Sequence, residues 1–405
     1  MTVTVLLLIL AAGLLLGTAT GNRWLLHRLQ PLIPGTLTID HWQGNLLDHV
    51  QLQGLHYQLG HLTLDLDRGD ARLDFLALLR GWLQFDQLHL DTLALSLTPS
   101  SGHPAAPLPD SVALPFGIAI DDAAVETLII NDDTLAQRIR GQHWRAWRRF
   151  KLTQVSGTIK GAQIHSQLQG QLQAPYRLKG NLDWQSPLPA SDSVTASQAK
   201  GSLTLHGPLT HLTVHHRLEQ PIKIDSRGLW LRKDDKWQLD LTHQWSAQPL
   251  PLTLPQPLSL GAGELHTRGP LTQLSIDLDT RLQAGEHPLT VTATGSLSPQ
   301  QLRLSPLTVS EKQQQLQARG TLSWAPLTWD LSLQGQLDPQ WLLPALPGAL
   351  TLTGSSRGQQ QQDRWQLANT KLTLDGQLRQ QPFQSHLSVT GNSQTLSLSG
   401  QGLWG

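Results

Sequence analysis

The stretch LSIDLDTRL, residues 274–282, alternates apolar and polar side chains, and this alternation decides the fold class. Successive side chains of a β-strand point to opposite faces of a sheet, so Leu274, Ile276, Leu278 and Leu282 are predicted to share one face. HLTLDLD, residues 61–67, and LTWDLSL, residues 327–333, have the same period of two. Their predicted apolar faces carry Leu62, Leu64, Leu66, Leu327, Trp329, Leu331 and Leu333.

The same pattern continues through most of the chain beyond Pro34, and helical periodicity is scarce. At about 14 residues for each strand with its turn, this region holds on the order of 25 strands. The exceptions are an amphipathic extension at residues 24–29, a short turn at residues 75–82 and residues 340–346. The sequence therefore predicts an all-β protein with an antiparallel sheet.

An internal repeat indicates that this sheet is elongated rather than compact. GSLTLHGPLTHLTV at residues 201–214 matches GELHTRGPLTQLSI at residues 263–276, and GTLSWAPLTWDLSL at residues 320–333 is a looser copy. Repetition of this kind is typical of one supersecondary unit stacked on copies of itself. The apolar face must still be covered, either by a second sheet, by closure into a barrel, or by curling into a groove that leaves room for an apolar ligand.

The composition narrows the function classes. The 405 residues carry 30 Lys and Arg against 30 Asp and Glu, so neither a basic nucleic-acid binder nor an acidic tail is indicated. There is no cysteine, which excludes disulfides, thiol catalysis and cysteine-ligated metal. The 34 glycines and 25 prolines spread along the chain are frequent turn signals, typical of many short strands.

The N-terminal stretch TVTVLLLILAAGLLLGTAT, residues 2–20, is almost continuously apolar and about long enough to cross a bilayer. It fits a cleaved signal peptide or a retained anchor. A basic segment before the apolar run, usual in signal peptides, is missing, which favours a single-pass anchor over residues 1–30. The first basic residues, Arg23 and Arg28, follow the apolar run, on the side that the positive-inside rule would place in the cytoplasm.

Two stretches resemble the TamB family of inner-membrane translocation and assembly subunits. Residues 34–97, beginning PGTLTIDHWQG, are similar to the segment that follows the family's anchor, and residues 320–354 and 365–389 are similar to its repeated middle region. The resemblance implies an anchor (1–30), an N-terminal β segment (31–98), a Pro/Ser-rich linker (99–110) and a repetitive β-groove region (111–405). Nothing resembling the family's C-terminal domain follows, so a truncated or short relative is expected.

The resemblance also implies a bacterial inner-membrane protein with its bulk in the periplasm. Its curled β-groove would carry phospholipids between membranes and support assembly of outer-membrane proteins and autotransporters, with a TamA-like outer-membrane barrel as partner. The rival hypothesis is an anchored periplasmic β-sandwich that binds an envelope partner. Under both hypotheses no cofactor and no nucleic acid are expected, and the protein is not an enzyme.

A few residue clusters resemble binding sites, but none has a complete set of catalytic or metal-binding residues. His211, His215 and His216 are the densest histidines, but strand alternation separates the last two and no ligand set is complete, so no metal site is predicted. Asp65, Asp67 and Asp70 fit a hairpin turn better than a calcium loop. No catalytic motif occurs. In HWRAWRRFK, residues 143–151, the basic residues Arg145, Arg148 and Arg149 are candidate contacts for lipid head groups, or simply lie at the rim of the sheet.

Overall fold

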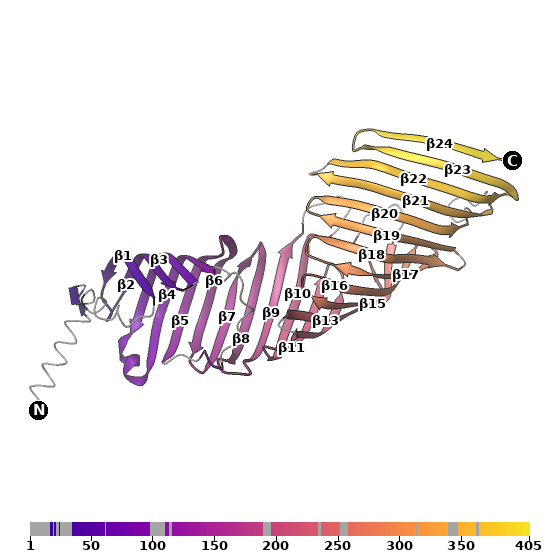
Figure 1. The fold of residues 1–405 in the computed structure, drawn as a ribbon. Coiled ribbons are helices and arrows are strands. Elements are labelled where there is room, and N and C mark those ends of the chain that lie inside the picture. Colours follow the sequence, from indigo (N-terminus) through magenta and orange to yellow (C-terminus); the bar gives the residue numbers. More distant parts are fainter. Residues whose placement is uncertain are drawn as a thin grey trace, which may run out of the picture. The chain divides into compact units, whose positions relative to one another are not determined.

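The computed structural model describes residues 17–18, 20–21, 24, 35–60, 62–97, 110–112, 116–188, 196–233, 236–251, 258–312, 314–338, 347–361 and 364–405. These residues form 24 strands and one 3-10 helix, which confirms the all-β prediction. The chain divides into unit 1 (Met1–Pro189 and Gln198–Leu212) and unit 2 (Ala190–Ser197 and Thr213–Gly405). Within each unit the described strands lie side by side in a single layer that is not closed into a barrel (Figure 1).

Unit 1 contains the first ten strands and the 3-10 helix η2. The strands are β1 (Thr36–Gly44), β2 (Val50–Leu59), β3 (Leu62–Asp74), β4 (Trp82–Leu97), β5 (Gly117–Ile130), β6 (Asp133–Ala146), β7 (Arg149–Ile159), β8 (Ala162–Gln171), β9 (Arg177–Pro187) and β10 (Gln198–Pro208), and η2 spans Phe75–Arg80. Neighbours in the chain pair antiparallel from β1 to β4 and again from β5 to β10.

The pair β4–β5 departs from this order because its strands run parallel, with Trp82 opposite Gly117 and Leu95 opposite Ile130. The sequence predicted only antiparallel pairing. A parallel pair requires the chain to return to the start of the first strand, and the long Pro-rich connection after β4 provides that return. The predicted linker, residues 99–110, lies outside the described residues except for Asp110. Because β4 and β5 pair directly, no break in the sheet occurs there.

Strand β3 passes straight through the predicted Asp-rich turn, so that prediction was wrong. Leu66 is buried, the next two residues are exposed, and then Gly69 and Ala71 are buried. A Cβ atom added to Gly69 would lie 2.9 Å from Cδ2 of Leu66 and 3.3 Å from Cδ2 of Leu90, so these residues lie on the same side of the sheet. Asp67 and Arg68 therefore mark a local irregularity of the strand, and the chain does not reverse there.

The predicted short turn at residues 75–82 is present as η2. The Asp74 side chain accepts a hydrogen bond from the Leu76 backbone N–H at 3.0 Å and caps the start of the helix. Gly81 ends it with a φ of 78°, in the left-handed region that favours glycine.

Unit 2 contains most of β11 (His211–Gln220) and all later strands. They are β12 (Ile224–Lys233), β13 (Lys236–Trp245), β14 (Gln248–Pro249), β15 (Leu258–Pro270), β16 (Leu274–Ala284), β17 (His287–Leu297), β18 (Gln301–Glu311), β19 (Gln314–Trp324), β20 (Leu327–Leu337), β21 (Gly348–Gln361), β22 (Arg364–Leu378), β23 (Gln381–Asn392) and β24 (Leu396–Trp404). The described pairings from β12 to β24 are all antiparallel, and the short β14 pairs with β15 beside β13.

The internal repeat corresponds to a strand, a tight turn and the next strand. The three copies fall at the ends of β10, β15 and β19 and at the starts of β11, β16 and β20. Gly207 and Gly269 occupy the same place in the first two copies and have nearly the same φ, 129° and 126°. Residues other than glycine rarely adopt this backbone conformation. The repeated Gly-Pro pair therefore reflects the geometry of the turn.

The predicted anchor lies almost wholly outside the described residues, as do residues 25–29 and 340–346. Among the residues that the structure describes, no helix is long and apolar enough to cross a membrane.

Candidate functional site: an apolar face crossed by continuous rows

The largest candidate site is one face of the sheet in unit 2. Residues opposite each other in neighbouring strands share a face, so the register shows which side chains form rows across the sheet. One row crosses nine strands from β15 to β23 without a charged residue. Its members are Leu265, Leu278, Ala293, Leu307, Ala318, Leu333, Gly354, Leu372 and Leu387.

Two further rows adjoin this one and bring the predicted lining residues together. Ile276 joins Leu331 through Gly295, Leu304 and Gly320. Similarly, the row from Leu274 to Trp329 passes through Leu297, Leu302 and Leu322. The predicted residues of β16 and those of β20 therefore lie in the same three rows, although more than 50 residues separate them in the chain.

This face is sheltered but not covered. On β16, Leu274, Ile276 and Leu278 are half-buried, whereas Ser275 and Asp277 between them are exposed. On β20 the same contrast separates the leucines from the polar residues between them. Within the described part of unit 2 no second layer lies over the rows, so much of their apolar surface remains accessible.

Glycines within the strands make room for the largest side chains of the rows. Gly358 lies opposite Trp329, and a Cβ atom added to Gly358 would lie 2.2 Å from Cζ2 of that indole. The indole Nε1 donates to Ser356 Oγ at 3.1 Å, so its polar end is satisfied. Gly263 lies opposite Trp245 in the same way, with a distance of 2.7 Å. Glycine is a frequent turn signal in a sequence, but these two glycines are inside strands, where they let a ring lie flat across the sheet.

A polar cluster that was not predicted from the sequence interrupts the apolar face in β12, β13 and β15. His243 contacts Ser226 Oγ through Nδ1 at 2.8 Å and Thr267 Oγ1 through Nε2 at 3.0 Å. Ser226 and Thr267 are 2% and 8% exposed, so their hydroxyls depend on these bonds. The alternation of β13 places His243 on the same face as Leu239 and Leu241, which could have shown that this histidine is not on the polar face.

His243 of this cluster and the nearby His216 both have a lowered pKa. Burial lowers the pKa of His243, and the nearby His216 and His266 add to the effect. Burial also lowers the pKa of His216, together with the adjacent His215. A buried imidazole loses hydration when it becomes charged, so both rings favour the neutral form. The cluster is therefore a neutral, hydrogen-bonded part of the apolar face.

The neighbouring histidines of β11 have different surroundings. His215 contacts Asp225 at 2.9 Å, whereas alternation turns His216 to the opposite side of β11. Burial of Asp225 opposes its ionisation, but hydrogen bonds from His215 and Arg227 outweigh this and lower its pKa. Among the described residues no group of three or more His, Asp or Glu side chains is arranged to hold a metal ion.

In unit 1 the predicted lining residues of β3 also lie among apolar partners. Leu64 lies opposite Tyr57 and Leu95, and Leu66 lies opposite Leu55 and Leu93. Leu62 lies opposite Leu59 at the end of the hairpin. The row through Leu66 crosses eight strands of unit 1 without a charged residue, nearly as many as the row in unit 2. Its members are Ile39, Leu55, Leu66, Leu93, Leu128, Ala136, Ile159 and Ala162.

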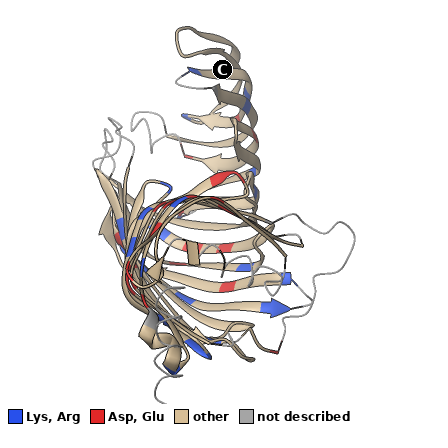
Figure 2. Ribbon diagram, turned by 90° about the vertical axis from the view of Figure 1, so that its left-hand side faces the viewer, with Lys and Arg blue, Asp and Glu red and all other residues tan. Residues whose placement is uncertain are grey.

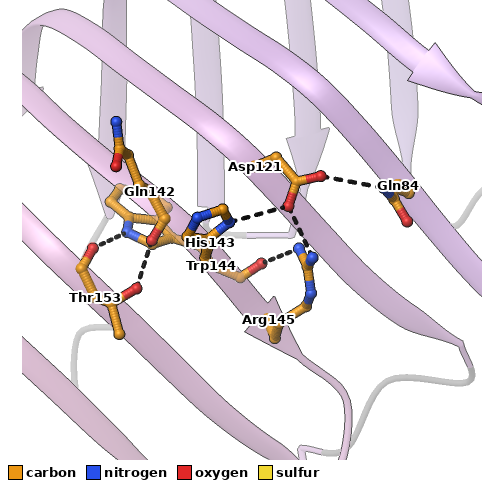
Figure 3. A network of polar contacts seen from close by, with 7 residues as sticks. All are labelled: Gln84, Asp121, Gln142, His143, Trp144, Arg145 and Thr153. Atoms are coloured by element: carbon orange, nitrogen blue, oxygen red, sulfur yellow. Dashed lines mark hydrogen bonds and ion pairs between the residues drawn. The ribbon is translucent and has the colours of Figure 1, made fainter.

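The basic aromatic segment forms the turn between β6 and β7, at the rim of unit 1. Arg145 is held by Asp121, which accepts from its Nη2 at 2.7 Å and from Gln84 Nε2 at 3.1 Å (Figure 3). Partial burial opposes ionisation of Asp121, but Arg145 and the neighbouring His143 outweigh it and lower the pKa of the carboxyl. Arg148 and Arg149 are exposed beyond this network. Of the three candidate head-group contacts, Arg145 thus already has a carboxylate partner.

These features define a class of protein: an all-β, single-layer sheet whose apolar rows are left uncovered. The family model described as TamB, N-terminal domain, matches residues 7–143 and 100–403, which together span most of the sequence. The chain belongs to the TamB family, and the resemblance seen in its sequence is confirmed. No curated protein and no solved structure matches the chain significantly.

Proposed function

We propose that this chain is an inner-membrane-anchored periplasmic protein whose apolar rows form the floor of a β-groove for phospholipid acyl chains. The groove would move phospholipids between the inner and outer membranes without chemical change, so the protein would not be an enzyme. The nine-strand row of unit 2 is the observation that supports this best. Membership of the TamB family is consistent with it.

The physical argument concerns the cost of moving acyl chains through water. Each buried methylene of a lipid chain is worth about 0.8 kcal/mol, so two chains exposed to water would cost on the order of 20 kcal/mol. Uninterrupted rows of Leu, Ile, Ala and Trp would offset most of this cost at every strand they cross. A chain moving along one row would meet nearly the same surface at each strand spacing of about 4.8 Å.

Photo-cross-linking in living cells tests the proposal directly. A photoreactive amino acid is placed at Leu331 or Ile276 in the full chain, in a Gram-negative host with radiolabelled phospholipid. Ser332 and Ser275 are matched controls, because each is the adjacent residue on the opposite face. Labelled lipid adducts are expected at Leu331 and Ile276, and at most a tenth as many at the serines.

The other outcomes decide between the two hypotheses. Equal lipid labelling on both faces would contradict a groove. Protein adducts at Leu331 without lipid would favour the rival binding or scaffold protein, whose partner would cover the apolar face.

The proposal also includes support for outer-membrane protein and autotransporter assembly, with a TamA-like barrel as partner. Family membership is its support. The full chain is expected to co-purify with such a barrel from cross-linked cells. If it does not, the proposed role in assembly is wrong, but the proposed lipid transfer is not affected.

A further inference from the structure

One rim of unit 1 exposes large apolar side chains on the short helix η2. Leu76 and Leu79 are 71% and 84% exposed, while Ala77 between them is 6% exposed and faces the sheet. Phe116, just before β5, is 41% exposed. Exposed leucines in one short turn are costly in water and are typical of a surface that meets an apolar partner.

These side chains belong to one continuous rim. The Gly117 backbone N–H donates to the Gly81 carbonyl at 2.9 Å, which joins the start of β5 to the end of η2. Next along the rim, the rings of Trp82 and Trp147 meet edge to face with centroids 5.5 Å apart. This contact joins η2 to the turn between β6 and β7, where Arg148 is exposed.

Beyond that turn the rim becomes strongly basic. The register places Lys151, Gln169, Lys179 and His206 in one row across four strands. An open depression beside this row is lined by Arg145, Arg149, Lys151, Arg177, Lys179 and His206, without a carboxylate.

Several cations elsewhere on the described strands have carboxylate partners. Arg140 pairs with Glu126, Arg227 with Asp225 and Arg357 with Asp330. Figure 2 shows both signs of charge along the strands. In the basic cluster only Arg145 has such a partner, Asp121, among the described residues. Two further acidic residues of the rim are Asp74, which caps η2, and Asp110, whose backbone carbonyl accepts from the Ala174 N–H beside the β8–β9 turn.

We infer that this rim of unit 1 docks on the surface of an anionic phospholipid membrane. Leu76, Leu79 and Phe116 would enter the interfacial layer, and the cations from Arg148 to Lys179 would lie over lipid phosphates. Clustered Lys and Arg beside inserted apolar side chains match the two attractions that hold proteins to such surfaces. This docking goes beyond the proposed lipid groove and does not depend on it, since it uses different residues.

The chain has no cysteine, so a single labelling site can be introduced without background. Leu79→Cys carries an environment-sensitive fluorophore, and Gln163→Cys, exposed near the other end of β8, is the matched control. The full chain is reconstituted into vesicles of phosphatidylcholine, with or without phosphatidylglycerol. A blue shift and quenching by lipid-borne quenchers are expected at position 79 with phosphatidylglycerol, and no change at position 163.

Charge reversal tests the role of the cations. Arg149→Glu, Lys151→Glu and Lys179→Glu together are expected to abolish the signal at position 79, at roughly a fivefold loss of docking for each charge. Lys312→Glu, Arg319→Glu and Lys371→Glu change the same charge in unit 2 and should leave the signal intact. Hydrogen exchange of β7 to β9 verifies that the reversed rim remains folded.

Two results would overturn the inference. One is a water-like fluorophore at position 79 in every vesicle. The other is an equal response in phosphatidylcholine alone, which would show that docking does not depend on attraction between the cations and anionic lipid. Neither result bears on lipid cross-links at Leu331, so the docking and the groove can fail separately.

Discussion

The parallel pair β4–β5 of unit 1 and the antiparallel run β16–β20 of unit 2 use similar Leu-rich sequences in different ways. In the antiparallel run the apolar residues stay in continuous rows on one face, even across the register shifts between Ala293 and Gly295 and between Leu304 and Leu307. In the parallel pair apolar residues lie on both faces, since the consecutive residues Leu93, Ala94 and Leu95 pair with Leu128, Ile129 and Ile130.

Burial follows the same division. Ala123 and Ala124 are adjacent, point to opposite sides of β5, and are only 2% and 5% exposed. Parallel strands usually have both faces covered, and this part of β5 agrees with that rule. In unit 2, Ser275, Asp277, Asp279 and Arg281 of β16 are exposed, whereas Leu274, Ile276 and Leu278 are half-buried. A strand buried on both sides can serve as a local core, whereas the one-sided run leaves an apolar surface for a ligand.

The largest expected effect comes from shortening the connection between β4 and β5. Nineteen residues (98–116) separate Leu97 from Gly117, and removing residues 99–108 leaves nine. The return path is about 50 Å for 15 residues of strand, whereas nine residues reach about 36 Å. The parallel pair should therefore separate, with a loss above about 4 kcal/mol and rapid hydrogen exchange in both strands.

A Gly/Ser replacement of residues 99–108 at constant length is the control, since it keeps the reach. Slow exchange in β4 and β5 after the deletion would show that the return path is shorter than the strand.

A smaller effect is expected when a glycine beneath a tryptophan gains a methyl group. Gly358→Ala forces the Trp329 ring off the sheet in unit 2, and Gly117→Ala does the same to Trp82 in unit 1, where the added Cβ would lie 2.5 Å from Cε3 of that ring. Overpacking of this kind costs about 1–3 kcal/mol, which denaturant unfolding of the full chain can measure. Gly402→Ala, with its nearest neighbour at 3.4 Å, should change stability little. Equal losses at all three positions would contradict the account.

The smallest expected effect concerns pH and is confined to unit 2. His243 has a pKa below its ordinary value of 6.5, so the unfolded chain binds this proton more readily. Stability should therefore be unchanged above about pH 6.5 and fall as the pH drops through that value. His243→Gln keeps a hydrogen-bonding side chain between Ser226 and Thr267 and should flatten the fall. Hydrogen exchange of β12 to β15 at several pH values measures this loss of stability. An unchanged pH dependence in the variant would show that His243 does not cause it.

Much of the fold could be predicted from local pattern. The period of two found the strands around residues 62, 274 and 327, and the Phe75–Arg80 turn was expected from its break in that period. Two predictions failed because composition was taken as turn chemistry. DLDRGD continues as a strand with a local irregularity, and the glycines at 263 and 358 lie under tryptophans rather than in turns.

The candidate site was only partly predictable. Leu274, Ile276 and Leu278 could be assigned to one face, but nothing local shows that they share rows with Trp329, Leu331 and Leu333. That depends on the register of four successive hairpins. The Ser226–His243–Thr267 cluster was missed for the same reason, since its members come from three strands.

The all-β class, the alternation of most strands and the family can be read from the amino-acid sequence, because these depend on residue order over short stretches. The parallel pairing of β4 with β5, the irregularity within β3 and the continuous rows of leucines emerge in the folded chain alone. Register and strand direction are set by contacts between residues far apart in the chain, and a one-residue shift would move every side chain to the other face.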